Sequence, residues 1–324
     1  MKKIKDLTLQ IIAGANVATA VTMFLVGLSD RINPTEHPIM ANIGLIFPGF
    51  IFINFCFLVF FALFRRRYML ISLLGFVVSY SSVRTYWPLN ISRDVPPGSI
   101  KVMSYNVHNF ASDNAPEGHD NPILEYIINS DADIVCLQEA VITDNLRDAV
   151  KDVYNYVDSV RSKNGGDCLV LLSKYPIKSS ERIEYESKNN VSAAFRVVVD
   201  EEIVTVINNH FETSGLKDMV KGKAGSDTMR AESKRLAVKL GESAKIRAPQ
   251  AEAVAEYVRK SGDNVILCGD FNDNPISYTH RTLARELTDC YVESGNGPGI
   301  SYHHNAIFVR IDNIMCSKLW QPYK

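Results

Sequence analysis

The chain has 324 residues, and its 35 lysines and arginines nearly balance its 36 aspartates and glutamates, giving a formal net charge of −1. This balance excludes binding to nucleic acid through a uniformly basic surface, although it does not exclude a local basic patch. The six cysteines show no Cys-x-x-Cys or Cys/His spacing, so a structural zinc site is not predicted.

The first 88 residues are much more apolar than the rest and contain three apolar segments, at 7–28, 41–64 and 68–87. A helix of roughly 20 residues crosses a bilayer core of about 30 Å, so each segment is long enough to span a membrane. A cleaved signal peptide does not account for the two further segments. We therefore predict a membrane region over 1–89 with three transmembrane helices. For the third segment, which contains four serines and Arg84, a buried helix is the alternative.

The basic residues around these segments predict their orientation. Three lysines lie within residues 2–5 and residues 65–67 are all arginine, whereas 29–38 contains only Arg31. Because short cytoplasmic loops carry the excess of Lys and Arg, the N-terminus and 65–67 are expected in the cytoplasm. Three crossings then place everything after about residue 90 outside, in a multi-pass protein of the cell (inner) membrane. If the third segment does not cross the membrane, the residues after about 90 are expected on the cytoplasmic side instead.

Residues 90–98, which include Pro96-Pro97-Gly98, are predicted to be a linker to a second domain over 99–324. There, short apolar runs alternate with stretches of helical spacing, as in an α/β protein. The expected strands are 100–107, 133–139, 154–160, 168–173, 192–199, 203–209, 264–268 and 307–316, and the expected helices are 122–130, 144–150, 229–240 and 248–260.

The loop after the strand at 264–268 reads Gly-Asp270-Phe-Asn272-Asp-Asn. Ligands of α/β sheets collect at the carboxyl ends of strands, and residues two apart along a strand share a face. A carboxylate beside an amide suits holding a water molecule against a phosphate oxygen. The alternative is an ordinary turn in which Asp and Asn bond their own backbone.

Polar side chains stand at the ends of four further strands, and any one of them alone is an ordinary strand end. They are Asn106, Glu139, the pair Asn208 and His210, and Asp312. Glu139 follows a buried apolar run directly, where a carboxylate is costly unless it is paired or bound to a metal. Carboxylate and amide oxygens without cysteine suit a hard cation such as Mg²⁺ or Mn²⁺.

These strand ends carry five motifs in a fixed order: Ser-Tyr-Asn106-Val, Leu-Gln-Glu139, Asn208-Asn-His210-Phe, Gly-Asp270-Phe-Asn272 and Arg310-Ile-Asp312. In order and spacing they resemble the endonuclease/exonuclease/phosphatase superfamily, which includes DNase I-like nucleases, exonuclease III-like enzymes, sphingomyelinases and inositol-polyphosphate phosphatases. The resemblance covers about 99–324. It implies a four-layer α/β (α+β) sandwich of two mixed β-sheets flanked by helices.

The resemblance also implies hydrolysis of a phosphoester by a water molecule, with Mg²⁺ or Mn²⁺ as cofactor. Glu139 would be the main metal ligand, with Asn106 close to the same site. Asp270 would orient or deprotonate the attacking water. These roles agree with the chemistry, because a metal neutralises developing charge and lowers the pKa of water.

The same resemblance assigns the remaining polar residues. Asn272 and His210 would stabilise charge on the phosphoryl oxygens, and fixed donors of this kind meet charge as it forms. Asp312 would orient a histidine. Asn208 and Arg310 are predicted to bind substrate.

Members of the superfamily usually carry a Ser-Asp-His motif on a last strand, after the strand that here holds Asp312. No histidine follows Asp312 in this sequence, and His303 and His304, which precede it, are expected on an ordinary strand. The expectation is therefore a domain without its last strand, C-terminally truncated and poorly active in this form.

The sequence does not distinguish well between nucleic acid, lipid and small phosphate esters as substrates. A basic stretch over 217–247 favours a nuclease, and a solvated helix face is the alternative reading of it. A membrane anchor favours a lipid or an extracytoplasmic polymer as substrate over chromosomal DNA. A lipid phosphoesterase similar to a sphingomyelinase or a phosphoinositide phosphatase is therefore the alternative. We expect a nuclease-like activity, with nucleic acid or a phospholipid head group as substrate. A catalytically inactive binding module is the alternative of another class, and no protein partner is evident.

Overall fold

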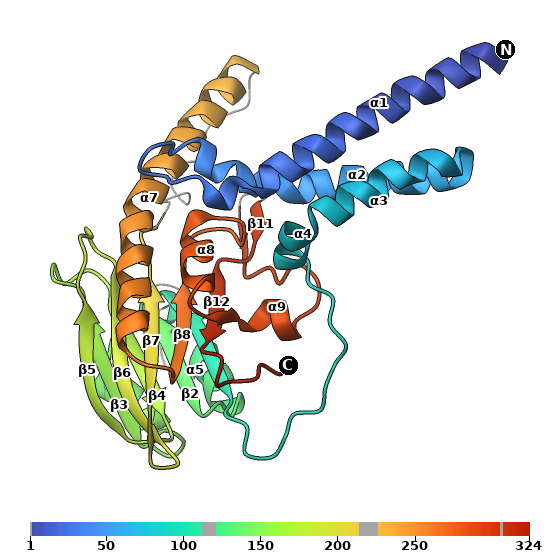
Figure 1. Cartoon of the computed structure of the whole chain (residues 1–324). Helices are drawn as coiled ribbons and strands as arrows, with labels where there is room; N and C mark the ends of the chain where they lie inside the picture. Colours follow the sequence, from blue (N-terminus) through green and yellow to red (C-terminus); the bar gives the residue numbers. More distant parts are fainter. Residues whose placement is uncertain (1, 112–120, 214–225, 305–306) are drawn as a thin grey trace.

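The structure is a computed structural model of the chain that describes residues 2–111, 121–213, 226–304 and 307–324. A bundle of long N-terminal helices projects from a compact body that contains the β-sheets (Figure 1). The chain therefore has a helical region followed by a sheet-containing region, in the order that the hydropathy pattern predicts.

The helical region has two helices that are long and apolar enough to cross a membrane. The first runs over Lys3–Arg31 and combines α1 (Lys2–Gly27) with the short 3₁₀ helix η1 (Ser29–Arg31). The second runs over Met40–Phe64 and combines the 3₁₀ helix η2 (Met40–Ile46) with α2 (Phe47–Phe64). The third expected helix is instead two helices, α3 (Arg66–Val78) and α4 (Tyr80–Tyr86), bent by 71°. If this bent pair is one span, the spans number three in the described chain.

The sheets are mixed. The first has four strands in the order β1 (Val102–Asn106), β2 (Ile134–Gln138), β4 (Cys168–Ser173), β3 (Tyr156–Arg161), of which β1 and β2 are parallel. The second has six, in the order β5 (Ile177–Ile183), β6 (Val191–Val199), β7 (Glu202–His210), β8 (Val265–Asp270), β12 (Asp312–Cys316), β9 (Thr288–Asp289), of which β7 and β8 are parallel. A separate hairpin joins β10 (Tyr302–His304) to β11 (Ile307–Val309).

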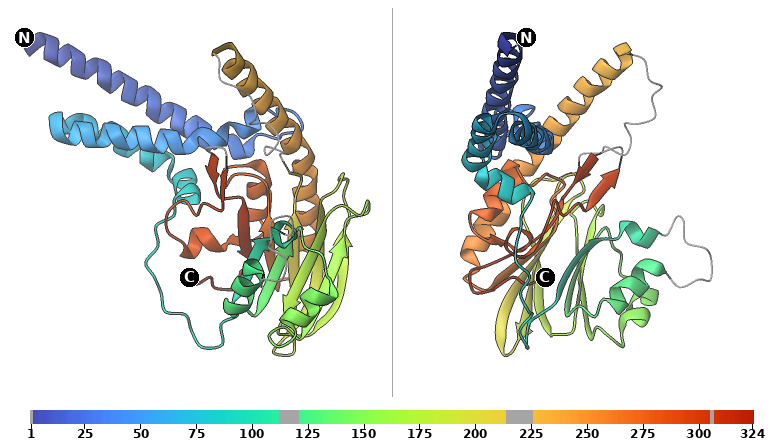
Figure 2. Two further views of the ribbon diagram at one scale, coloured as in Figure 1. Left: turned by 180° about the vertical axis from the view of Figure 1, so that it is seen from behind. Right: turned by 90° about the vertical axis from the view of Figure 1, so that its right-hand side faces the viewer.

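Successive side chains of a strand point to opposite faces of its sheet. Each sheet therefore packs against the other sheet on one face and against helices on the other, which gives four layers. On β2, Ile134 and Cys136 face the second sheet, whereas Val135 and Leu137 pack with residues of α5 (Pro122–Asn129) and α6 (Asp144–Val150). The outer face of the second sheet packs in the same way against α7 (Ser226–Lys260) and α8 (Tyr278–Ala284). The views in Figure 2 show this order of layers, which confirms the predicted fold class.

Three further expected elements differ from the structure. The helices expected at 229–240 and 248–260 are one helix of 35 residues, α7, which continues through Pro249. Its buried Ala244, Ala248 and Ala251 explain why the polar stretch between them stays helical. The strand expected at 307–316 is interrupted between β11 and β12, where the buried Arg310 turns toward Asp289.

Asp289 is the centre of a buried charged cluster that holds this interruption in place. One carboxylate oxygen caps α9 (Cys290–Ser294) by accepting the backbone N–H groups of Tyr291 and Val292 at 2.8 and 3.0 Å. The other lies 2.8 Å from His280 Nε2 and 3.2 Å from Arg310. Burial alone would raise the pKa of Asp289, but His280 and Arg310 hold it well below its usual range.

We predict that Asp289→Asn destabilises the protein by about 3–5 kcal/mol at pH 7, because it leaves the buried Arg310 without its counter-charge. Chemical denaturation in detergent measures the difference. Since the folded pKa lies below the unfolded value of about 3.9, the carboxylate's contribution is fully present above that value and is lost as the pH falls through the folded pKa. The difference between wild type and variant should therefore shrink below about pH 4, and equal stability at pH 7 would contradict the prediction.

Candidate active site

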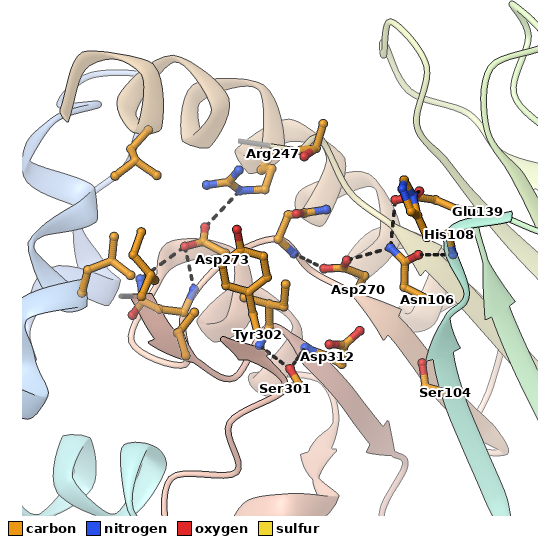
Figure 3. Close-up of a pocket in the computed structure, with 18 of the residues that line it drawn as sticks. Ser104, Asn106, His108, Glu139, Arg247, Asp270, Asp273, Ser301, Tyr302 and Asp312 are labelled. Carbon is orange, nitrogen blue, oxygen red and sulfur yellow. Dashed lines mark hydrogen bonds and ion pairs between the residues drawn. The ribbon is translucent and has the colours of Figure 1, made fainter. Parts of the chain in front are cut away.

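The carboxyl ends of β1, β2 and β8 meet the start of β12 at one cleft of about 650 Å³. Five residues predicted from strand ends line it: Asn106, Glu139, Asp270, Asn272 and Asp312. Figure 3 shows Asn106 and Glu139 on one side of this cleft, with Asp270 and Asp312 facing them. The structure therefore brings together side chains from both sheets.

The amide of Asn106 connects the two sheets within the cleft. Its Nδ2 donates to Glu139 Oε1 at 3.0 Å and to Asp270 Oδ2 at 3.2 Å, while its Oδ1 accepts the backbone N–H of His108 at 3.2 Å. A single NH₂ group thus holds two carboxylates, one after β2 and one at the end of β8, beside each other (Figure 3).

Glu139 adopts a left-handed backbone conformation, with φ of 51°, which turns it out of the buried strand. Its Oε2 lies 2.8 Å from Nδ1 of His108, a residue that the strand-end argument missed although it follows Asn106 by only two positions. Burial would raise the pKa of Glu139, but the hydrogen bonds from His108 and Asn106 lower it. Glu139 is therefore an ionised oxygen donor at neutral pH.

His210 lies behind this pair, buried, with Nε2 3.8 Å from Glu139 Oε1 and Nδ1 2.7 Å from Asp167 Oδ2. Burial alone would lower the pKa of His210. The hydrogen bond and charge of Asp167, together with the charges of Asp270 and Glu139, raise it to about 9 instead. The site thus keeps one buried cation among its carboxylates, and Asp167 is the second functional residue that the sequence reasoning missed.

Asp270 and Asp312 are directly opposite each other on β8 and β12. Burial raises the pKa of both, that of Asp312 to about 7, with the charge of Asp270 as the next cause. Asp312 Oδ1 is buried and has no hydrogen-bond partner among the described residues. Burial and the negative charge of Asp270 therefore make Asp312 harder to ionise.

The loop after β8 contains the turn that the sequence left open as the alternative. Asp270 Oδ1 accepts the backbone N–H of Asn272 at 2.8 Å, which is an Asx turn, while Oδ2 faces Asn106. Asn272 Nδ2 donates to the carbonyl of Phe211 at 3.0 Å, which fixes the side chain at the cleft wall. The neighbouring Asp273 is held by the buried Arg247 at 3.2 Å.

Asn208 and Arg310, both predicted to bind substrate, lie elsewhere. Asn208 is fully buried, accepts from Gln138 at 2.7 Å, and donates to the carbonyls of Leu137 and Val170 at 3.0 and 3.3 Å. It cross-links the two sheets. Arg310 is buried against Asp289, and neither side chain is among the described residues that line the cleft.

The basic stretch at 217–247 does not form a described basic surface at the cleft. Lys217, Lys221 and Lys223 lie outside the described residues. Arg247, at its end, is buried in its ion pair with Asp273. Two residues of the helical region, Asn42 and Leu45, do line the cleft, and nothing in the sequence pattern indicated this.

The donor set fits a hard divalent cation. Glu139 offers an ionised carboxylate at the cleft, a ligand type that Mg²⁺ prefers, whereas Asn106 turns its NH₂ group toward Glu139 and its Oδ1 toward the backbone N–H of His108. Among the described residues no group of three or more His, Cys, Asp or Glu side chains is placed to hold a metal. Mg²⁺ needs only one or two carboxylates because it usually keeps several waters, so the smaller set suffices.

The two helix-flanked mixed sheets, with acidic and amide side chains at their shared edge, define the DNase I-like class of fold. The chain belongs to the Endonuclease/Exonuclease/phosphatase family, whose model matches residues 103–324. Residues 9–86 match a second model, described as a domain of unknown function (DUF8431). A search among curated proteins found no match.

Solved structures similar to the chain include sphingomyelinase C from Streptomyces griseocarneus, with 19% identity, a TM-score of 0.49, and coverage of 68% of this chain and 84% of that one. A β-hairpin deletion mutant of β-toxin from Staphylococcus aureus has 19% identity and a TM-score of 0.46, covering 70% and 89%. The human nocturnin catalytic domain has 19% identity and a TM-score of 0.47, covering 68% and 82%. At these identities the likeness concerns the fold alone.

We predict that Asp167→Asn lowers the pKa of His210 from about 9, because it removes the hydrogen bond and the charge that most strongly oppose the effect of burial. NMR titration of the histidine ring protons in metal-free protein measures this shift, and a His210→Gln variant assigns the resonance. A pKa that stays near 9 in Asp167→Asn would show that Asp167 does not hold the proton on His210.

Proposed function

We propose that this chain is a membrane-anchored phosphoester hydrolase that uses a divalent metal and a water nucleophile. One observation carries the proposal. The side-chain amide of Asn106 donates hydrogen bonds to both Glu139 and Asp270, and the buried His210 lies next to Glu139. Membership of the family supports phosphoester hydrolysis as the reaction class.

Glu139, with Asn106 beside it, would hold Mg²⁺ or Mn²⁺. When bound, the ion supplies positive charge to the phosphate oxygens and makes water easier to deprotonate. The hydrogen bonds that keep Glu139 ionised also orient it toward the cleft.

The other residues act on water and phosphate directly or through a neighbouring group. Asp270, whose pKa burial raises, orients the attacking water and takes its proton, since a base is most effective when its pKa approaches the working pH. His210 and Asn272 stabilise negative charge on the phosphoryl oxygens. Asp312 is a positioning residue that holds a proton donor beside Asp270, and its unpartnered Oδ1 is the acceptor available for it.

The helical region supports an extracytoplasmic catalytic domain. The N-terminus and the junction of α2 and α3 lie at the end of the helical bundle that is remote from the sheets (Figure 1). Both places carry the clustered Lys and Arg residues, at 2–5 and 65–67. By the positive-inside rule this remote end would be cytoplasmic and the catalytic end would lie on the other side. Nuclease-like specificity stays a prediction at this point.

We predict that Glu139→Gln and Asp270→Asn each reduce phosphodiester hydrolysis about 10²–10⁴-fold, because they remove the metal-holding carboxylate and the base. The full chain in detergent with Mg²⁺ is tested on DNA, RNA, sphingomyelin, phosphoinositides and bis-p-nitrophenyl phosphate. Glu184→Gln, at an exposed ion pair away from the cleft, is the matched control and should retain wild-type rates. If the folded wild-type protein hydrolyses none of these substrates, the result contradicts the hydrolase proposal and favours a catalytically inactive binding module.

Removal of divalent metal with EDTA should abolish hydrolysis, and Mg²⁺ or Mn²⁺ should restore it. Because a carboxylate ligand is replaced by a neutral amide, Glu139→Gln should need a higher Mg²⁺ concentration for its residual activity, measured by metal titration. Activity that persists in EDTA, or an unchanged metal requirement in Glu139→Gln, would contradict the assigned metal site.

A further inference from the structure

The segment that connects α1 to α2, residues 28–46, forms part of the cleft wall. Its η2 helix contributes Asn42 and Leu45 to the lining, opposite the catalytic side chains. The two stretches that are long and apolar enough to cross a membrane, Lys3–Arg31 and Met40–Phe64, extend into this connector and include η1 and η2. The wall of the cleft and the ends of the apolar helices are therefore the same short stretch of chain.

The connector is tightly fastened to the catalytic loop. A side chain at Gly44 would have its Cβ 2.4 Å from the carbonyl oxygen of Ile276, so only glycine fits this contact. Ser29 Oγ donates to the same carbonyl at 3.3 Å, and Asp30 pairs with Arg281 at 3.0 Å. Ile276 follows Asp270 by only six residues. The helix ends are thus held at a fixed position relative to the reacting groups.

A second attachment lies at the end of the helical region. Arg84 on α4 pairs with Glu293 on α9 at 3.1 Å, and Arg310 donates to the carbonyl of Thr85 at 3.1 Å. Asn90 Nδ2 donates to the carbonyls of Val292 and Gly295. Two independent attachments mean that the sheets do not hang from the membrane on a free linker.

The composition of the cleft favours an amphiphilic ligand over a nucleic acid. Among its described lining residues the only basic side chains are His108, next to Glu139, and Arg247, which is paired with Asp273. Leu45 and Leu240 line it where the connector meets α7. A groove that follows a polynucleotide needs several free cations along its length, and the described lining does not supply them.

The outer side of the connector is apolar as well. Ile39, Met40 and Ile46 are each more than half exposed, at 51%, 51% and 55%. At the ends of membrane-spanning helices, such side chains lie in the interfacial layer of the bilayer. If the apolar stretches cross a bilayer, the part of the cleft wall that the connector forms lies near the bilayer surface.

We propose that the substrate is an amphiphilic phosphoester that stays in the bilayer through its apolar part, while its phosphate enters the cleft between the connector and the catalytic loop. This inference rests on the proposed phosphoester hydrolysis and names the class of substrate. In this arrangement Leu45 contacts the apolar part of the substrate next to its phosphate. The phosphate itself reaches Asp270 and Glu139 in the cleft.

The test uses the full chain reconstituted in vesicles with Mg²⁺. Long-chain sphingomyelin, phosphatidylglycerol and phosphatidylinositol phosphate are each compared with the water-soluble short-chain analogue of the same head group, and bis-p-nitrophenyl phosphate and a single-stranded oligonucleotide complete the panel. At least one long-chain probe should be hydrolysed about tenfold faster, or more, than its short-chain analogue, since confinement in the same bilayer raises its effective concentration.

Leu45→Asp should reduce the ratio of long-chain to short-chain hydrolysis about tenfold, and Leu45→Ala should reduce it less, because a charge at the bilayer interface repels the apolar part of the substrate. Leu319→Asp is the matched control, since Leu319 is exposed and lies outside the cleft lining, and it should leave the ratio unchanged.

Equal rates for every long-chain and short-chain pair, or hydrolysis of the oligonucleotide alone, would overturn this inference and leave the proposed hydrolase function intact. An unchanged ratio in both Leu45 variants would overturn it too. Hydrolysis of none of the probes, bis-p-nitrophenyl phosphate included, would instead reject the proposed function itself.

Discussion

The hydrogen bonds that Asn106 donates to Glu139 and Asp270 are the interaction on which the site depends. The two carboxylates belong to different sheets, so the site exists only when both sheets are assembled and held at a fixed separation. Asn208 contributes to that assembly from inside the sandwich, where its amide connects β7 to the backbones of β2 and β4. A buried cationic His210, held by Asp167, offsets part of the cost of bringing acidic groups together.

The strand ends were predictable because two rules of sheet geometry act locally. Apolar runs reveal the buried strands, and a polar residue directly after such a run marks where the strand leaves the core. Asn106, Glu139, Asp270, Asn272 and Asp312 all lie in the cleft for this reason. His108 and Asp167 escaped prediction because their importance arises from contacts with Glu139 and His210, which are 31 and 43 residues away in the chain.

Asn208 and Arg310, which were expected to bind substrate, do not line the cleft, and the reason again lies in contacts between distant segments. Asn208 and His210 share a face of β7, and strand periodicity does not reveal that the first sheet covers the position of Asn208 completely. Arg310 is paired through β9 and α4, and the latter lies 225 residues earlier in the chain. The resemblance that suggested substrate contacts for both residues describes a motif, whereas burial is decided by packing between distant segments.

The helical region forms part of the cleft wall, which the division of the sequence into a membrane region and a second domain did not predict. Hydropathy separates residues 1–89 from the rest as a membrane region, yet Asn42 and Leu45 stand in the wall of the cleft. Contacts through Gly44, Asp30 and Arg84 make the apolar helices a structural part of the catalytic body. The proposed anchoring therefore positions the active site at the membrane surface as well as retaining it there.

The most direct test of this account is anomalous X-ray diffraction from crystals of the full chain grown with Mn²⁺. An anomalous peak in the cleft, at about 2.1 Å from a carboxylate oxygen of Glu139 and lost in Glu139→Gln, is the predicted result. Well-ordered wild-type crystals with Mn²⁺ bound only elsewhere, or with no peak at Glu139, would contradict the central claim that this junction of two sheets is a metal-dependent active site.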